Sequence, residues 1–91
     1  MKASVIDPKD NVAVVLGAVK KGDTISFHRG GEVCEVIAAE DIPPYHKVAS
    51  QQIPEGAPVV KYGEHIGLAS QDIQPGSHVH VHNVLNNREA L

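Results

Sequence analysis

The apolar residues of this chain fall into short runs that are separated by turn-forming residues. Each run has four to seven residues and is bounded by Gly, Pro, Asp or Asn. The runs cover residues 3–6, 12–16, 24–27, 32–38, 57–62, 65–69 and 78–84. A helix would show apolar positions at a period of 3.6 over ten or more residues, and none of these runs does so. The pattern therefore predicts an all-β fold with little or no helix.

A seven-residue pattern occurs four times and predicts tight corners between the strands. It consists of an apolar residue, two residues, a turn residue, two residues and a second apolar residue. The copies are residues 19–25, 42–48, 53–59 and 73–79. Glycine is the central residue in three copies (Gly22, Gly56, Gly76), where a turn can require positive φ; Tyr45 takes this place in the second copy and costs roughly 1 kcal/mol if its backbone is left-handed. Repeated corners of this kind predict a compact, sharply folded β module.

Length, charge and cysteine usage narrow the possible functions. The 91 residues are expected to form one domain, 1–91, because a second core would need roughly another 100 residues. A formal charge of −3 leaves no broad basic surface, so phosphate-directed nucleic-acid binding is not expected. With no apolar run near the ~18 residues of a membrane span and no signal region, we expect no membrane contact and a cytoplasmic location. Cys34 is the only cysteine and is expected to be a buried thiol.

The run HVHVHNV carries three histidines at alternate positions, His78, His80 and His82. In an extended strand they share one face, while Val79, Val81 and Val84 turn to the core. Neighbouring histidines then have Cα atoms about 6.6 Å apart, from which two imidazoles reach one metal ion at ~2.0–2.1 Å per bond. The outer pair, about 13 Å apart, does not easily share that ion. The strand thus supplies two ligands, and a solvated face that merely tolerates histidine explains the spacing equally well.

Any further ligands must come from His46, His65, Glu64, an Asp or another chain. The stretch PPYHKVA sets His46 and Lys47 just beyond a proline-stiffened turn, and KYGEHIG gathers Lys61, Tyr62, Glu64 and His65 around a glycine. A lysine here can hold a carboxylate, the tyrosine can donate a hydrogen bond, and Glu64 or a histidine can act as a base. Taken singly, each of these residues also fits an ordinary surface role.

Three segments together resemble the small SAF-type β-clip domain of the altronate and galactarate dehydratase family. They are DNVAVVLGAVKKGDTI, DIPPYHKVA and VVKYGEHIGLASQDIQPGSHVHVHNV. The resemblance extends from about Asp10 to Val84, and the combination of K-Y-G-E-x-I-G with G-x-H-V-H-V-H-N-V is specific. The family usually has glycine where this chain has Tyr45, so the loop geometry around His46 is the least certain part of the likeness.

The resemblance implies a sugar-acid hydro-lyase that requires iron(II) or manganese(II). In many family members the small domain is joined to a much larger catalytic region, which this chain lacks, so the implied role is that of a small subunit completed by a separate large subunit. The roles that follow are His80 and His82 at the metal or in proton transfer, and Asn83 as an orienting hydrogen-bonding group. His46, Lys47 and Lys61 would contact the carboxylate or hydroxyls of the substrate. The general base itself can lie on the large subunit.

Two alternatives stay open at this point. A sister pair in the same family cleaves sulfite from sulfolactate, and that substrate also presents a carboxylate beside a hydroxyl. From a different class, a non-catalytic carbohydrate-binding SAF module fits the size; ice binding does not, because six histidines and a single threonine are a poor match to a flat, weakly charged face. Self-association through exposed strand edges is also open.

Overall fold

The computed structural model describes residues 1–86, and its strands are short and antiparallel. They are β1 (Ala3–Ser4), β2 (Val12–Val15), β3 (Thr24–Arg29), β4 (Glu32–Ile37), β5 (Lys47–Ala49), β6 (Pro58–Lys61), β7 (Glu64–Ala69), β8 (His78–Val79) and β9 (Val84–Leu85). No helix occurs among residues 1–86, so the prediction of an all-β fold is confirmed. It follows that no helix in this part of the chain could cross a membrane.

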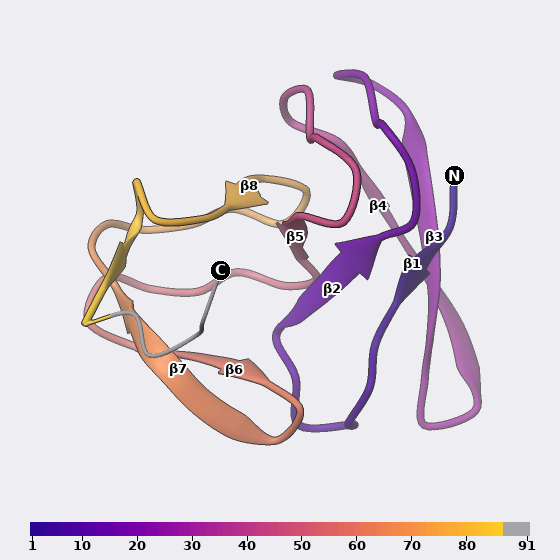
Figure 1. Ribbon diagram of the computed structural model, residues 1–91. Helices are drawn as coiled ribbons and strands as arrows, with labels where there is room; N and C mark the ends of the chain where they lie inside the picture. Colours follow the sequence, from indigo (N-terminus) through magenta and orange to yellow (C-terminus); the bar gives the residue numbers. More distant parts are fainter. Residues whose placement is uncertain (87–91) are drawn as a thin grey trace.

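The strands form three small sheets. The central sheet has the order β1-β2-β5-β8, the hairpin β3-β4 stands alone, and the third sheet has the order β6-β7-β9. Figure 1 shows the β3–β4 hairpin on one side and the β6–β7 hairpin on the other, with β2 and β5 between them. The arrangement agrees with the sharply folded β-clip module that the sequence predicts.

The four copies of the seven-residue pattern form the corners of this fold. Their outer residues are Val19 and Ile25, Ile42 and Val48, Ile53 and Val59, and Ile73 and Val79, and all eight are at most 2% exposed. The central glycines have φ between 83° and 93°, and Tyr45 has φ 65°. Tyr45 therefore has the left-handed backbone for which the sequence predicts a cost of roughly 1 kcal/mol.

The four corners pair in twos, and each pair encloses its own hydrophobic core. Val19 and Ile42 exchange backbone hydrogen bonds of 2.9 Å, and Ile53 and Ile73 exchange bonds of 2.8 Å. The first core surrounds Val19 and Ile42, and the second surrounds Ile53 and Ile73. The chain therefore consists of two similar units, each a corner, a hairpin and a second corner.

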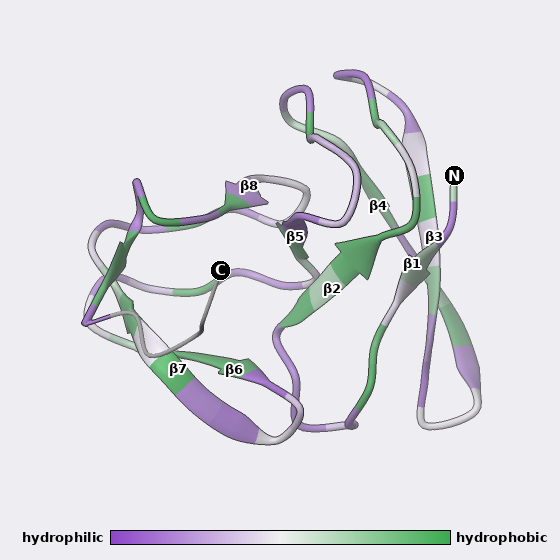
Figure 2. Cartoon of the chain, viewed as in Figure 1, coloured by the Kyte–Doolittle hydropathy of each residue, from purple (hydrophilic) through white to green (hydrophobic). Residues whose placement is uncertain are grey.

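Strand β5 is the last strand of the first unit and the first strand of the second. It pairs with β2 through Ala13↔Val48 and Val14↔Lys47, and with β8 through Lys47↔Val79 and Val48↔His78. The β5–β8 pairing thus repeats the β2–β5 pairing in the same register. Figure 2 shows the chemical difference between the two, because β2 is coloured hydrophobic while β8 is partly hydrophilic.

The corner that leads into β8 is locked against the end of β4. Ala39 donates its backbone N–H to the carbonyl oxygen of Gly76 at 2.9 Å. A Cβ atom added to Gly76 would overlap the carbonyl oxygen of Ile37, whereas one added to Gly56 at the equivalent corner would meet no atom within 4 Å. Glycine is required at position 76 both by its φ and by this close approach.

Three details of the sequence-based prediction are wrong. Strand β5 was not among the predicted runs. It is only three residues long and begins with a lysine, so it shows no apolar pattern. The run 78–84 is not one strand, since a turn at residues 81–83 separates β8 from β9. Cys34 is half-buried at the edge of the first core instead of fully enclosed.

Candidate metal and proton-transfer site

The three alternating histidines lie on a strand end and the turn that follows it. β8 ends at Val79, which is fully buried, and Val84 of β9 is buried as predicted. Val81 is 55% exposed, so its predicted place in the core is wrong. The turn occurs because residues 81–83 leave the sheet and bring the chain back toward β7, with which β9 pairs.

Asn83 holds this turn in shape through both ends of its side-chain amide. Its Oδ1 accepts the backbone N–H of His80 at 3.0 Å, and its Nδ2 donates to the backbone carbonyl of His78 at 2.9 Å. The residue is 3% exposed, so these two bonds replace contacts with water that its amide would otherwise make. Asn83 therefore fixes the direction in which the His78 and His80 side chains leave the backbone.

His46, in the corner before β5, completes a cluster of three imidazoles with His78 and His80. The ring of His46 stacks on that of His80 with centroids 4.2 Å apart, and its Nδ1 lies 2.9 Å from Nε2 of His78. One nitrogen from each of the three residues lies within 4.8 Å of the other two, and all three side chains are half-buried. Two ligands of one tetrahedral ion are roughly 3.3 Å apart, so the three residues fit a metal ion with a small adjustment.

The register of the sheet explains why His46 and His80 meet. The pair Ala13↔Val48 of β2 and β5 is equivalent to the pair Lys47↔Val79 of β5 and β8. One residue further along each strand, Val12 is equivalent to His46 (34 positions later) and Ala49 to His80 (31 positions later). Val12 and Ala49 are paired across β2 and β5. The stacked histidines therefore occupy, in the second strand pair, the place of an apolar pair in the first.

Burial lowers the pKa of His78 from 6.5 to about 4, and the neighbouring imidazoles of His82, His46 and His80 add to this effect. Glu40 opposes it: its carboxylate raises the pKa of His78 and accepts the His78 backbone N–H at 3.1 Å. The His78 ring is consequently neutral at pH 7 and has a lone pair available for a metal ion. In its hydrogen bond with His46, the tautomers decide which ring donates.

His82 lies beside the cluster on its exposed side. Its ring centroid is 5.2 Å from that of His78. The extended strand on which the predicted separation of the outer histidines depended is interrupted by the turn at residues 81–83. His82 is not one of the three residues whose ligand atoms converge, and its proposed role as a ligand or proton carrier stays a prediction.

The two lysines and Asn83 are placed differently from one another. Lys47 is 3% exposed within β5, between β2 and β8. Lys61 ends β6 and is half-buried, with Nζ 5.1 Å from the centre of the Tyr62 ring. The structure shows an internal contact for Asn83. Its role as an orienting group and the substrate contacts of His46, Lys47 and Lys61 stay predictions.

His78 and Glu40 were not among the residues predicted to act at the site. The signal for His78 was present in its alternation with His80, but the choice of partner required knowing where the strand ends. Glu40 lies 38 positions from His78, and no local pattern connects the two residues. The position of His46 opposite His80 follows from the register of β5 against β8.

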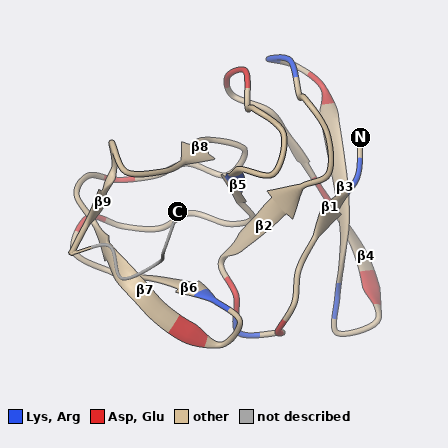
Figure 3. Cartoon of the chain, viewed as in Figure 1, with Lys and Arg blue, Asp and Glu red and all other residues tan. Residues whose placement is uncertain are grey.

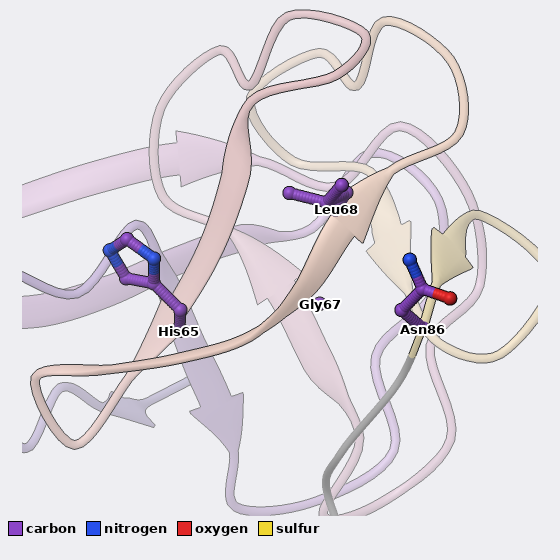
Figure 4. A pocket seen from close by; sticks show the side chains of 4 residues that line it. All are labelled: His65, Gly67, Leu68 and Asn86. Atoms are coloured by element: carbon purple, nitrogen blue, oxygen red, sulfur yellow. The ribbon is translucent and has the colours of Figure 1, made fainter.

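A separate shallow pocket lies at the β7–β9 side of the molecule. Figure 4 shows its lining residues, His65, Gly67, Leu68 and Asn86. His65 is a candidate ligand from the sequence, yet it lies here and is not one of the three converging histidines. Figure 3 shows that Lys and Arg residues are dispersed over several elements.

Comparisons with known proteins give one family over nearly the whole described chain. The model of the altronate/galactarate dehydratase SAF domain matches residues 1–87. The altronate dehydratase of Bacillus subtilis (strain 168) is 45% identical over 82 residues, which are 90% of this chain and 16% of that protein. The (2R)-sulfolactate sulfo-lyase subunit alpha of Paracoccus pantotrophus is 45% identical over 51 residues, 56% of this chain and 76% of that subunit. The chain thus spans about a sixth of the altronate dehydratase that it matches.

Proposed function

Because the chain belongs to the altronate/galactarate dehydratase SAF family, we propose that it is the small subunit of a sugar-acid hydro-lyase. In this proposal it contributes histidines to a metal-dependent active site that a larger catalytic subunit completes. The names and lengths of the altronate dehydratases support the proposal, since the matched segment is a small part of each. The sulfo-lyase relatives are described as alpha subunits, which supports a role as one subunit of a larger enzyme.

The observation that carries the proposal is the convergence of His46, His78 and His80 at the edge of the central sheet. Dehydration of a 2,3-dihydroxy acid removes a weakly acidic proton beside a carboxylate and then expels the β-hydroxyl as water. A divalent metal ion, when bound, supplies positive charge for the carboxylate and the developing enolate. A neutral histidine of the cluster can accept or return a proton, and His82, on the exposed side, is the candidate for transfer to the leaving hydroxyl.

The donor atoms favour iron(II) over manganese(II) as the metal. All three converging ligands are imidazole nitrogens, which suit iron, zinc, copper and nickel, whereas manganese favours carboxylate and water oxygen. The carboxylate of Glu40 acts on His78 but accepts the His78 backbone N–H, so it is engaged with the backbone. An oxygen ligand from the large subunit would complete the coordination.

Metal binding can be tested on the isolated chain, prepared without a histidine tag. Anaerobic calorimetry with iron(II) should give one site per chain, and replacing His46, His78 or His80 with alanine should each weaken binding on the order of 100-fold. His28→Ala is the matched control, because His28 is exposed on β3. His82→Ala distinguishes the two ligand sets: unchanged affinity assigns the metal to the converging three, and an equal loss assigns His82 as a ligand.

Activity can be tested in a chimera of this chain with the Bacillus subtilis altronate dehydratase. The matched segment of this chain replaces the 82 residues of that enzyme to which it is similar. The chimera should dehydrate altronate, and His80→Ala should abolish the reaction. A folded chimera with no activity on altronate or other sugar acids would remove the hydro-lyase assignment.

Sulfolactate cleavage is the second candidate, favoured by the similarity to two sulfo-lyase alpha subunits. The same site could serve it, because that substrate also has a carboxylate beside a hydroxyl. Release of sulfite from sulfolactate by a complex containing this chain, with no action on altronate, would favour this reaction. A carbohydrate-binding module without catalysis would instead bind sugar acids equally well after the three histidines are replaced.

A further inference from the structure

The histidine cluster lies where the repeating pattern of the fold leaves a surface uncovered. In the first strand pair, Val12 and Ala49 are at most 1% exposed, because the second unit packs its core over them. In the second strand pair, His46 and His80 hold the equivalent register positions. Both are only half-buried, and no third unit follows within residues 1–86 to cover them. A body that packed here as the second unit packs on the first would enclose the imidazoles.

Two exposed apolar residues are the immediate sequence neighbours of the cluster. Tyr45 immediately precedes His46 and is 73% exposed, and Val81 immediately follows His80 and is 55% exposed. Tyr45 also has a positive φ of 65°, whereas the equivalent residue Gly76 has the same role without strain. The backbone N–H of each makes the same bond, from Tyr45 to Val15 and from Gly76 to Ala49, both at 2.9 Å. The hydrogen bond of this corner therefore does not require tyrosine, and strain of this kind is typical of functional sites.

We propose that the histidine face, defined as Tyr45, His46, His78, His80 and Val81, is the surface on which the large catalytic subunit docks. This inference rests on the proposed function. The altronate dehydratase of Bacillus subtilis extends far beyond the matched segment, which is 16% of its length, so a large body is available to cover this face. Tyr45 is the anchor, because exposed tyrosines are enriched among residues that dominate binding energy.

The chemistry of the face specifies what the partner presents. Three imidazole nitrogens converge without a carboxylate among them, so a complementary surface supplies an Asp or Glu side chain as an oxygen ligand. Around this carboxylate the partner requires an apolar recess for the Tyr45 ring and the Val81 methyl groups. Docking would withdraw the imidazoles from water, which strengthens their interaction with a metal ion or a charged substrate.

The test compares variants in the chimera with the Bacillus subtilis enzyme by hydrogen exchange and by activity. Relative to the isolated chain, backbone amides of Tyr45, His46, Lys47 and residues 80–82 should exchange at least about tenfold more slowly in the chimera. Tyr45→Gly should reverse this protection and lower kcat/KM at least about tenfold. In the isolated chain the same variant should unfold at an equal or higher temperature than the parent, which a merely structural tyrosine would not allow. Tyr45→Phe, which keeps the aromatic ring, should keep both the protection and the activity of the parent chimera.

Val33→Ser is the control for loss of exposed apolar surface elsewhere, because Val33 is 66% exposed on β4. It should change neither protection nor activity. Protection confined to the β3–β4 hairpin in an active chimera would overturn the docking face and leave the proposed function intact. Protection of the histidine face in a chimera without dehydratase activity would support docking and count against the proposed function. A chimera that fails to fold, although the isolated chain folds, counts against docking.

Discussion

Replacing Gly76 with alanine should destabilise the protein far more than the same change at Gly56. Both glycines are the central residues of equivalent corners, with φ of 87° and 83°. Alanine in left-handed backbone costs about 1–2 kcal/mol, of which about 0.4–1 kcal/mol is returned because the unfolded chain becomes less flexible. Gly56→Ala should therefore lower the free energy of unfolding by about 1 kcal/mol, since its Cβ meets no atom within 4 Å.

Gly76→Ala carries an additional steric cost. Its Cβ would overlap the carbonyl oxygen of Ile37 at less than 3.0 Å, and backbone on either side has to move. Forcing extra volume into a packed site costs about 1–3 kcal/mol, which gives a total loss of about 2–4 kcal/mol.

Urea unfolding followed by circular dichroism measures both variants, and the midpoint of Gly76→Ala should fall about 1 M below that of Gly56→Ala. Equal midpoints would refute the close approach between the corner before β8 and the end of β4. Because His78 follows two residues after Gly76, the variant should also weaken metal binding, whereas Gly56→Ala should not.

Three further predictions concern the surroundings of the cluster. Asn83→Ala should lower the free energy of unfolding by about 2–4 kcal/mol and the metal affinity about tenfold, because the N–H of His80 and the carbonyl of His78 lose their partner. Urea unfolding and calorimetry measure the two effects, and exposed Gln52→Ala is the control. In the metal-free chain the folded-state pKa of His78 is about 4, below the unfolded value of 6.5, so the unfolded state binds more protons between these values and stability should fall as the pH drops from 6.5 to 4. His78→Gln should flatten that dependence in thermal unfolding scans, while His28→Gln should not. Glu40→Gln should lower the pKa of His78 further, as measured by NMR titration, because it removes the carboxylate that raises it; an upward shift would contradict this assignment.

The corners of the fold follow from sequence because their information is local. Gly22, Gly56 and Gly76, each between two buried apolar residues, predict a turn with positive φ, and the structure has one at every copy. At Tyr45 the sequence predicted only the cost of a left-handed backbone, and the structure shows that backbone with φ 65°. The pairing of the corners in twos is set by contacts between distant residues, such as Val19 with Ile42, which composition and alternation do not encode.

The candidate site was only half predictable for the same reason. The alternation of His78, His80 and His82 was visible, but the end of β8 at Val79 depends on Asn83 folding back to bind the backbone of His78 and His80. An asparagine side chain that replaces strand pairing leaves no periodic trace. The choice of His46 as the third member depends on the register of β5 against β8, which is a tertiary property.

The sharing of β5 by both units bears on how the protein could be divided. A cut before residue 47 would leave the first unit without its last strand, and a cut after residue 49 would leave the second without its first. One fragment then carries all three residues, and only reassembly of both fragments gives β5 its partners on both edges, β2 and β8, so neither fragment should fold alone while the two together should. His46 directly precedes this shared strand, so loss of a metal ion bound there would indicate that the strand pairing of either unit is disrupted.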